Sequence, residues 1–132
     1  MDKTEKQFVE FAASLKFSDL SPAAIHAAKA RFVDSFGVAL AAQQAPTVKA
    51  ARKLAASVRS GPRARILGSL ETVTPDMAAF VNGAMVRYLD MNDAYTRAST
   101  SHPSDNIPAL LAVAEATGAS GRDLILATII CY

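Results

Sequence analysis

The chain is 132 residues long, and 51% of it is hydrophobic but only 7% is aromatic. This length suits one domain or part of one, and an apolar content dominated by Ala, Leu, Val and Ile favours closely packed helices. The net charge of +2 is too small to indicate a nucleic-acid partner or a membrane surface, and no stretch is apolar for long enough to predict a membrane span. The single cysteine, Cys131, excludes an internal disulfide and predicts a reducing compartment, the cytoplasm.

Two helices are predicted in the first third of the chain. Apolar residues at helical spacing from Phe8 to Leu15 predict a helix over residues 4–16. Ser21-Pro22 is an N-cap followed by proline at the first helical position, so a long helix should run from there to a break at Pro46. We expect this second helix to bury a stripe made of Ile25, Ala28, Phe32, Phe36 and Leu40. Its outward face should carry His26, Lys29 and Arg31.

The middle of the chain predicts two more helices with a short extended piece between them. A basic amphipathic helix is expected over residues 47–58, with its apolar side formed by Val48, Ala51, Leu54, Ala55 and Val58. Residues 64–67 are interpreted as extended. Thr74-Pro75-Asp76 repeats the cap-and-proline start and adds an acid where the helix dipole favours it, so a helix should continue to about Leu89.

The last part of the chain predicts a loop and two helices. Residues 90–105 lack apolar periodicity and are expected to form the loop. The first helix should begin at Asn106 or Ile107 and end at Gly118, and residues 120–123 predict a capping box for an apolar helix that runs to the end. The fold class predicted is therefore all-α, a multi-helix bundle. An apolar helix at the end leaves surface of a buried type, so we expect a fragment of a longer protein.

The polar segment from Arg87 to Asn106 contains more acidic, amide and imidazole groups than a loop needs. Its polar residues include Arg87, Asp90, Asn92, Asp93, His102, Ser104, Asp105 and Asn106. An imidazole titrates near neutral pH and can give or accept a proton, which suits a functional site. The alternative is a loop whose Asp90 and Asn106 merely cap the two helices that it joins. The residues alone support the two interpretations equally.

Other chemistries are excluded by residue spacing. Residues 90–92 begin like a calcium loop, but Ala94, Tyr95 and Ser101 occupy the next ligand, turn-glycine and closing-glutamate positions. The two histidines and Cys131 lack the short spacing of zinc ligands, and no glycine-rich phosphate loop or nucleophile elbow is present, so no metal site is expected. A basic group is interpreted as a solvated face, since no aromatic residues interleave it. It consists of Lys49, Arg52, Lys53, Arg59, Arg63 and Arg65.

Acid–base chemistry remains, with His102 as the group that moves the proton. Asp90, Asp93 and Asp105 are the candidates that could fix its tautomer. Arg87 could bind a substrate carboxylate through two parallel hydrogen bonds, or it could pair with Asp90 or Asp93 nearby. Both roles for Arg87 stay open at this point.

Several motifs occur in a characteristic order along the chain. They are Phe32 to Gly37, Ile66 to Gly68, Asn82-Gly83, Met85 to Asp93, His102 to Asn106, Ala114 to Ala116 and Gly118 to Gly121. In order and spacing they resemble the MmgE/PrpD family, over nearly the whole chain. The resemblance implies that residues 1–132 are the first part of an all-helical domain in a longer protein, whose smaller α/β domain closes over the active site. It also implies proton chemistry without a cofactor on small di- and tricarboxylates, in a homodimer.

The resemblance implies separate roles within the polar segment. His102 takes the place of the family's active-site histidine, and Asp90 that of the aspartate opening its Asp-x-Asn/Asp-Asp motif, so both are predicted to be catalytic. The residues predicted to bind substrate are Arg87, Asn92, Asp93 and Ser104. The motif version with Arg87 and Asn92 is similar to that of dehydratase-like members, although Ala94 stands where a threonine is common.

The predicted reaction is a dehydration of the 2-methylcitrate type, in which His102 helps to abstract a proton alpha to a carboxylate and Asp90 orients the reacting groups. Decarboxylation of the cis-aconitate type and epimerisation of iminodisuccinate are alternatives within the family. A non-catalytic helical interaction module is the alternative from another class, and the sequence following Tyr132 would distinguish it. We expect the 132-residue chain alone to be inactive, because the resemblance places other catalytic groups beyond it.

Overall fold

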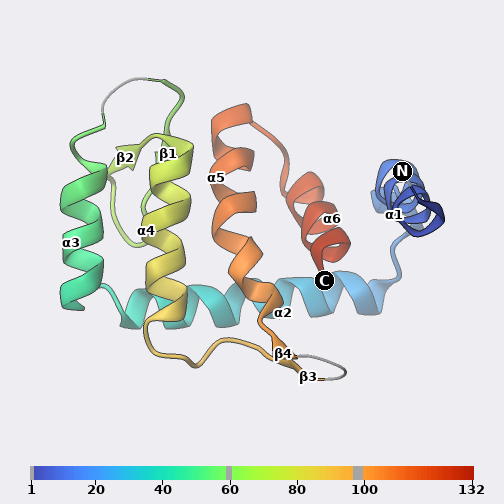
Figure 1. The fold of residues 1–132 in the computed structure, drawn as a ribbon, viewed down its shortest axis with the longest axis horizontal. Coiled ribbons are helices and arrows are strands. Elements are labelled where there is room, and N and C mark those ends of the chain that lie inside the picture. The colour runs from blue at the N-terminus through green and yellow to red at the C-terminus, as the bar shows by residue number, and fades with distance from the viewer. Residues whose placement is uncertain (1, 59–60, 97–99) are drawn as a thin grey trace.

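The computed structural model describes residues 2–58, 61–96 and 100–132 (Figure 1). Its helices are α1 (Lys3–Ser14), α2 (Pro22–Ala41), α3 (Pro46–Ala55), α4 (Pro75–Arg87), α5 (Ile107–Thr117) and α6 (Gly121–Cys131), with short 3-10 helices η1 (Phe17–Asp19) and η2 (Pro103–Asn106). The strands form two small hairpins, β1 (Ala64–Arg65) with β2 (Thr72–Val73) and β3 (Tyr95–Thr96) with β4 (Thr100–Ser101). The predicted all-α class is confirmed. Within the described residues, none of the helices combines the length and hydropathy needed to span a membrane.

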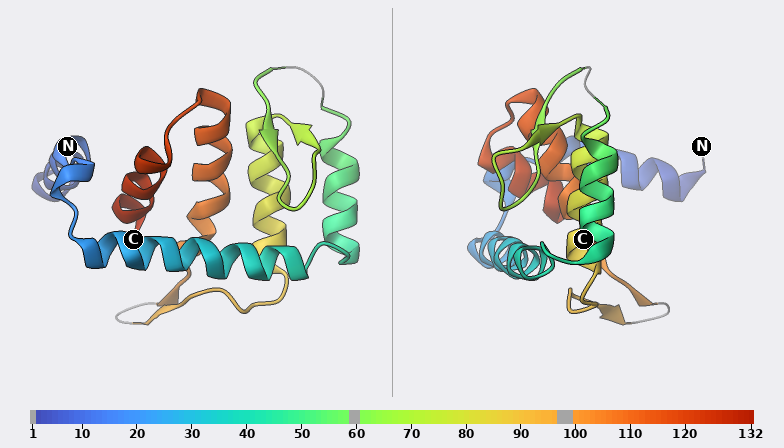
Figure 2. Two further views of the ribbon diagram at one scale, coloured as in Figure 1. Left: turned by 180° about the vertical axis from the view of Figure 1, so that it is seen from behind. Right: turned by 90° about the vertical axis from the view of Figure 1, so that its left-hand side faces the viewer.

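Helix α2 forms a base on which α3, α4, α5 and α6 stand in a row (Figure 1, Figure 2). Helix α4 occupies the centre and contacts α2, α3 and α5, whereas α6 contacts α5 and α2. Helix α1 projects beyond the far end of α2, away from the row (Figure 2). The polar segment leaves the end of α4 next to α2 and returns at the start of α5, so packing of α4 against α5 holds its two ends together.

The core is built mainly from small side chains, which allow the helices to approach one another closely. Its largest fully buried apolar members are Ile66, Met85, Ile107, Val48, Val81 and Val86. Each such side chain contributes on the order of 1.5–3 kcal/mol when it is removed from water. Alanines on α2, α3, α4 and α5 fill the spaces between them. The result is a rigid support on one side of the polar segment.

The β1–β2 hairpin is attached to α4 by one buried side chain, Asn82. Its Oδ1 accepts a hydrogen bond from the Leu67 amide at 2.9 Å, and its Nδ2 donates to the Arg65 carbonyl at 3.0 Å. Arg65 also pairs with Glu115 of α5 at 2.8 Å. The extended piece predicted over 64–67 is therefore present as a strand at Ala64–Arg65, but its partner strand at Thr72–Val73 was not predicted.

The predicted core stripes of α1 and α2 are partly wrong. Leu40 is 47% exposed, because α2 packs through a different set of small side chains. The buried members of α2 are Ala28, Ser35, Val38 and Ala39. Helix α1 buries no residue, and Phe8 and Phe11 on its apolar face are exposed, because α1 stands apart from the row. The outward placement of His26, Lys29 and Arg31 is confirmed.

Helix boundaries were predicted more accurately than burial. Gly118 ends α5 in the left-handed conformation, and Ser120 and Asp123 form the predicted capping box of α6. The prediction of a loop over 90–105 is wrong in part, because the segment contains β3, β4 and η2. Residues 97–99 of that segment lie outside the described residues, as does Arg59 of the predicted basic group.

Candidate active site

The polar segment begins with a sharp turn at the end of α4. Asp90 has a φ of +51° and is the one non-glycine residue with positive φ in the described part of the chain. Aspartate tolerates this left-handed conformation better than most residues, and the Asp90 amide donates to the Arg87 carbonyl at 3.1 Å. The turn directs the chain away from the helix axis and places Asn92 back against the protein.

Asn92 is the centre of a network that joins the end of α4 to η2. Its Oδ1 accepts from Arg87 Nη1 at 2.8 Å, and its Nδ2 donates to Ser104 Oγ at 3.0 Å and to Asp105 Oδ1 at 3.1 Å. Asn92 is 8% exposed and Ser104 is fully buried. An amide is required here because the same side chain must accept from a guanidinium and donate to a carboxylate.

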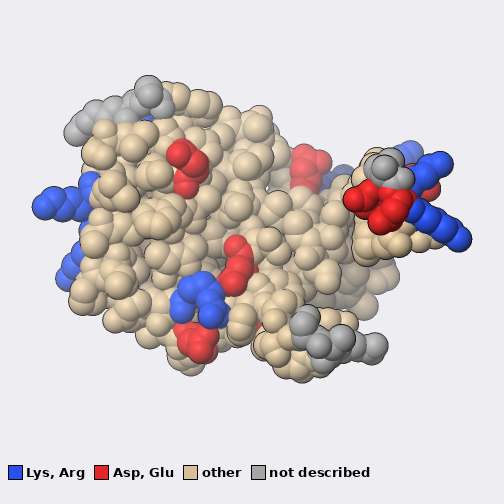
Figure 3. All heavy atoms as spheres, viewed as in Figure 1, with Lys and Arg blue, Asp and Glu red and all other residues tan. Residues whose placement is uncertain are grey.

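Arg87 completes this network with two acidic partners. Its Nη2 lies 3.1 Å from Asp90 Oδ1, and its Nε lies 3.8 Å from Asp105 Oδ1. Figure 3 shows basic and acidic side chains meeting at the lower edge of the molecule, on the side where α4 ends. The pairing of Arg87 with Asp90 is the alternative that the sequence had left open, and it leaves the Arg87 side chain 39% exposed.

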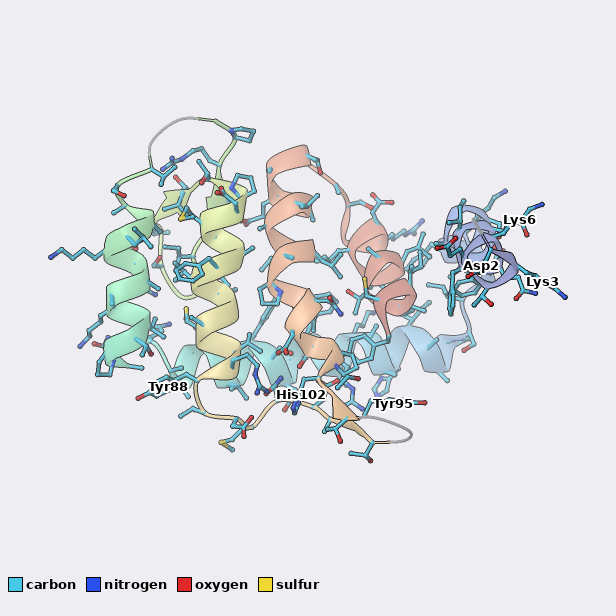
Figure 4. All side chains as sticks on the ribbon, in the orientation of Figure 1. Asp2, Lys3, Lys6, Tyr88, Tyr95 and His102 are labelled. Atoms are coloured by element: carbon cyan, nitrogen blue, oxygen red, sulfur yellow. The ribbon has the colours of Figure 1, made fainter. Side chains whose placement is uncertain are left out.

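His102 is held by a backbone group of the same segment. Its Nδ1 lies 2.7 Å from the Asp93 carbonyl oxygen, which can only accept a hydrogen bond. Nδ1 therefore carries the proton, and in the neutral imidazole the lone pair is on Nε2. Figure 4 shows His102 at the lower edge of the molecule, between the labelled Tyr88 and Tyr95. Among the residues that the structure describes, none bonds to Nε2.

The Asp93 carboxylate is fixed from a different direction. Its Oδ1 accepts a hydrogen bond from the Ser104 amide at 3.0 Å. Burial favours the neutral acid, but the Ser104 side chain and amide, the Tyr132 hydroxyl and the charge of Arg31 outweigh it and hold the pKa of Asp93 below its ordinary value of 3.8. Burial and the hydrogen bond to Asp93 raise the pKa of the Tyr132 hydroxyl well above its ordinary range.

The structure brings most of the predicted site residues together but divides them into two groups. Arg87, Asn92 and Ser104 share one network, while Asp93 and His102 form the other. Asp90 does not contact His102: its side chain is 75% exposed and pairs with Arg87. Of the three aspartates considered for fixing the His102 tautomer, it is Asp93 that does so, through its carbonyl and not its carboxylate.

Two participants were not assigned to the site from the sequence. Asp105 was considered only as a partner for His102, but it contacts Asn92 and Arg87. Tyr132 was predicted to belong to an apolar helix. Its polar hydroxyl at the end of that helix is the sequence feature that could have indicated a place near the site. The alternative of a loop that only caps helices is weakened, since the Asn106 side chain makes no cap hydrogen bond and donates to the Pro103 carbonyl.

The acidic and imidazole side chains of the site are held apart from one another. Within residues 2–58, 61–96 and 100–132, no three His, Cys, Asp or Glu side chains converge closely enough to hold a metal ion. The hydrogen-bonding groups of Asn92 are already occupied by protein partners. What the site can do with the groups described is accept a proton at His102 Nε2.

The fold and this site define an all-helical domain that presents a histidine-bearing polar segment at the edge where α4 ends and α5 begins. The chain belongs to the MmgE/PrpD family, since the model of the MmgE/PrpD N-terminal domain matches residues 6–132. This finding confirms the resemblance drawn from the motifs.

Three similar proteins are named as 2-methylcitrate dehydratases or as a 2-methylcitrate dehydratase-like protein. The chain is 37% identical over 98 residues to a probable 2-methylcitrate dehydratase of Saccharomyces cerevisiae, covering 72% of this chain and 19% of the relative. It is 38% identical over 87 residues to 2-methylcitrate dehydratase of Salmonella typhimurium, covering 63% and 17%. It is 34% identical over 119 residues to the 2-methylcitrate dehydratase-like protein oryR of Aspergillus oryzae, covering 86% and 23%. The chain thus spans about a fifth of the length of these relatives.

Proposed function

We propose that this domain supplies part of the active site of a 2-methylcitrate dehydratase-like hydro-lyase in the full-length protein. The family and the names of the relatives support the substrate class. The observation that carries the proposal is the 2.7 Å contact between His102 Nδ1 and the Asp93 carbonyl, because it leaves Nε2 as a base. We further infer a homodimer located in the cytoplasm, acting on a small carboxylate without a resident cofactor.

The chemistry is an elimination of water. His102 Nε2 takes a proton from the carbon alpha to a substrate carboxylate, and the electron pair of that C–H bond forms the new carbon–carbon double bond. The C–O bond to the β-hydroxyl breaks, and the departing oxygen takes up a proton to leave as water. The imidazolium formed in the first step can return that proton, so that the enzyme ends unchanged.

Arg87 and Asp90 are proposed to meet the substrate. Their ion pair spans three residues at the end of α4, and the Asp90 side chain is largely exposed. Exposed pairs of this kind contribute only about 0–1 kcal/mol, so a substrate carboxylate can replace Asp90 on the guanidinium at little cost. Asp90, once released, is placed to orient the substrate hydroxyl.

Asn92, Asp93 and Ser104 are proposed to shape the substrate-binding wall of the pocket. Asn92 and Ser104 are buried, and their polar groups contact protein partners in this structure. Asp93 joins Ser104 to His102 through its carboxylate and its carbonyl. Their part in substrate binding is therefore to hold the Arg87 guanidinium and the imidazole in place.

The test uses the full-length protein and the variant His102→Ala. We expect the unaltered protein to release water from 2-methylcitrate, and the variant to lose about 100-fold or more in kcat, the usual contribution of a positioned acid–base group. His26→Ala is the matched control, because His26 is an exposed residue of α2 that is remote from the polar segment in sequence, and it should retain full turnover.

Three results would contradict the proposal. Turnover of cis-aconitate or iminodisuccinate in place of 2-methylcitrate would assign another reaction to the site. Unchanged kcat in His102→Ala would remove His102 from the reaction. Absence of turnover on all three compounds would favour a non-catalytic helical module.

A further inference from the structure

Two acidic side chains flank the guanidinium of Arg87, and the protein holds them differently. Asp90 comes from the turn after α4, and its Oδ1 lies 3.1 Å from Arg87 Nη2 with the side chain 75% exposed. Asp105 comes from η2, and its Oδ1 lies 3.8 Å from Arg87 Nε. The same oxygen of Asp105 also accepts a hydrogen bond from Asn92 Nδ2 at 3.1 Å. Asp105 is therefore tied to two side chains of the site, one of which is buried.

Arg87, Asn92 and Asp105 form a closed triangle of side-chain contacts. Arg87 Nη1 donates to Asn92 Oδ1 at 2.8 Å, Asn92 Nδ2 donates to Asp105 Oδ1, and that oxygen faces Arg87 Nε. A guanidinium only donates and a carboxylate only accepts, so one orientation of the amide serves both neighbours. The triangle joins the last residue of α4 to η2 and restrains the guanidinium at two of its three nitrogens.

The triangle limits how firmly Arg87 can hold Asp90. A guanidinium binds a carboxylate best when two of its nitrogens face both carboxylate oxygens. Nη1 is directed to Asn92 and Nε to Asp105, so Asp90 meets the remaining nitrogen, Nη2. An exposed ion pair of this kind is weak. A substrate carboxylate that approaches Nη2 therefore displaces a loosely held partner.

We propose that Asp105 is a positioning residue that keeps Arg87 available to the substrate. This inference rests on the proposed function, because it takes Arg87 as the group that receives a substrate carboxylate. Asp105 acts by attracting Nε and by holding the amide of Asn92 toward Nη1. Without these restraints the guanidinium can turn and bind Asp90 through two nitrogens. The substrate would then have to break a strong ion pair in place of a weak one.

A different role for Asp105 predicts the opposite result. If its negative charge acted only by repelling an anionic substrate, removing that charge would strengthen binding. Two substitutions separate the roles. Asp105→Asn removes the charge but keeps an oxygen that can accept from Asn92, whereas Asp105→Ala removes both. The proposal therefore predicts weaker binding in Asp105→Ala and near-normal binding in Asp105→Asn.

The first experiment measures the affinity of the full-length protein for tricarballylate by titration calorimetry. This tricarboxylate has no hydroxyl and cannot be dehydrated. We expect Asp105→Ala to weaken binding about tenfold, the usual effect of one hydrogen bond to a charged group, and Asp105→Asn to weaken it by about twofold or less. Glu10→Ala is the control, because it removes an exposed acid that pairs with Lys6 on α1, and it should leave the affinity unchanged. Tighter or unchanged binding in Asp105→Ala would overturn the proposal.

The second experiment tests whether Asp105 acts by limiting the pairing of Arg87 with Asp90. In a double-mutant cycle on the same affinity, Asp105→Ala should weaken binding when Asp90 is present and have little effect in Asp90→Ala. The reason is that no carboxylate then remains at that position to capture the guanidinium. An equal loss in both backgrounds would mean that Asp105 acts by another route, which contradicts the proposal.

The third experiment separates this inference from the proposed function. In a crystal structure of full-length Asp105→Ala, the Arg87 guanidinium should leave Asn92 Oδ1 and face Asp90 with two nitrogens, whereas in Asp105→Asn it should keep its contact with Asn92. If the protein neither binds tricarballylate nor dehydrates 2-methylcitrate, the proposed function fails, yet the position of Arg87 still shows whether Asp105 restrains it. An Arg87 that stays on Asn92 in Asp105→Ala overturns the inference whatever the activity.

Discussion

Two connecting segments of this domain, the β1–β2 hairpin and the polar segment, each bond to a buried asparagine, but the partners of the two asparagines differ in kind. Asn82 holds the β1–β2 hairpin by bonding the Leu67 amide and the Arg65 carbonyl. Asn92 holds the polar segment by bonding the side chains of Arg87, Ser104 and Asp105. Backbone partners are present whatever the sequence, whereas side-chain partners exist only if the right residues stand at the right positions.

This difference in partners suggests that Asn82 has a structural role and that Asn92 has a role in the site. The Asn82 contacts involve no charge and would tolerate many changes in the hairpin sequence. The Asn92 contacts lie between a guanidinium and a carboxylate, so they fix the orientation of the amide and tie the segment to charged groups that can meet a substrate. We expect changes at Asn92 to act mainly on activity and changes at Asn82 mainly on stability.

The largest effect is predicted for Asn92→Asp. A carboxylate can still accept from Arg87, but it cannot donate to Ser104 and it faces the Asp105 carboxylate, whose present contact with the amide is 3.1 Å. We expect kcat/KM of the full-length protein for 2-methylcitrate to fall about 100-fold, a loss typical of a displaced catalytic group. Steady-state kinetics would measure this change.

A charge exchange provides the control for that prediction. In the double variant Asn92→Asp with Asp105→Asn, the new amide can donate to the new carboxylate, and the net charge of the cluster is unchanged. Most of the lost activity should return. If the double variant is as slow as Asn92→Asp, the contact between these two positions is not what orders the site.

The two connections also differ in how far the sequence could predict them. The starts of α2 and α4 and the end of α5 follow from local signals, namely the Ser21 cap with Pro22, Pro75 in the first turn of α4, and Gly118, because each acts on its neighbours in the chain. Composition and motifs likewise placed the polar segment and its histidine. Local signals act over a few residues, so they locate elements without showing which elements touch.

Pairings between distant residues were not predictable in the same way. The bonds of Asn82 to the hairpin and of Arg65 to Glu115 depend on how α4 and α5 pack, and no local pattern encodes that. The same limit explains the wrong prediction for Leu40, which lies at core spacing on α2 but on a side that the other helices leave exposed. Periodicity shows that a helix has an apolar face, but not what covers it.

A loss of stability is predicted for Asn82→Ala. The Asn82 side chain is fully buried. Its removal breaks two hydrogen bonds, so the Leu67 amide and the Arg65 carbonyl lose this partner. We expect the free energy of unfolding of the full-length protein to fall by about 2–3 kcal/mol, measured by urea denaturation. Turnover per folded molecule should stay within about twofold of the unaltered protein. A large fall in kcat with unchanged stability would reverse the roles assigned to the two asparagines.

The smallest effect, the pH dependence of stability, distinguishes the two connections most directly. The pKa of Asp93 in the folded chain lies below its ordinary value of 3.8, so the ionised carboxyl stabilises the fold above that value and loses this contribution as the pH falls through the lowered folded pKa. The difference in unfolding free energy between the unaltered protein and Asp93→Asn should be constant above about pH 5 and shrink in stronger acid. Asn82 has no ionising partner, so the effect of Asn82→Ala should not change over the same range. A pH-independent effect of Asp93→Asn would show that the Ser104 contact does not depend on the charge of that carboxyl.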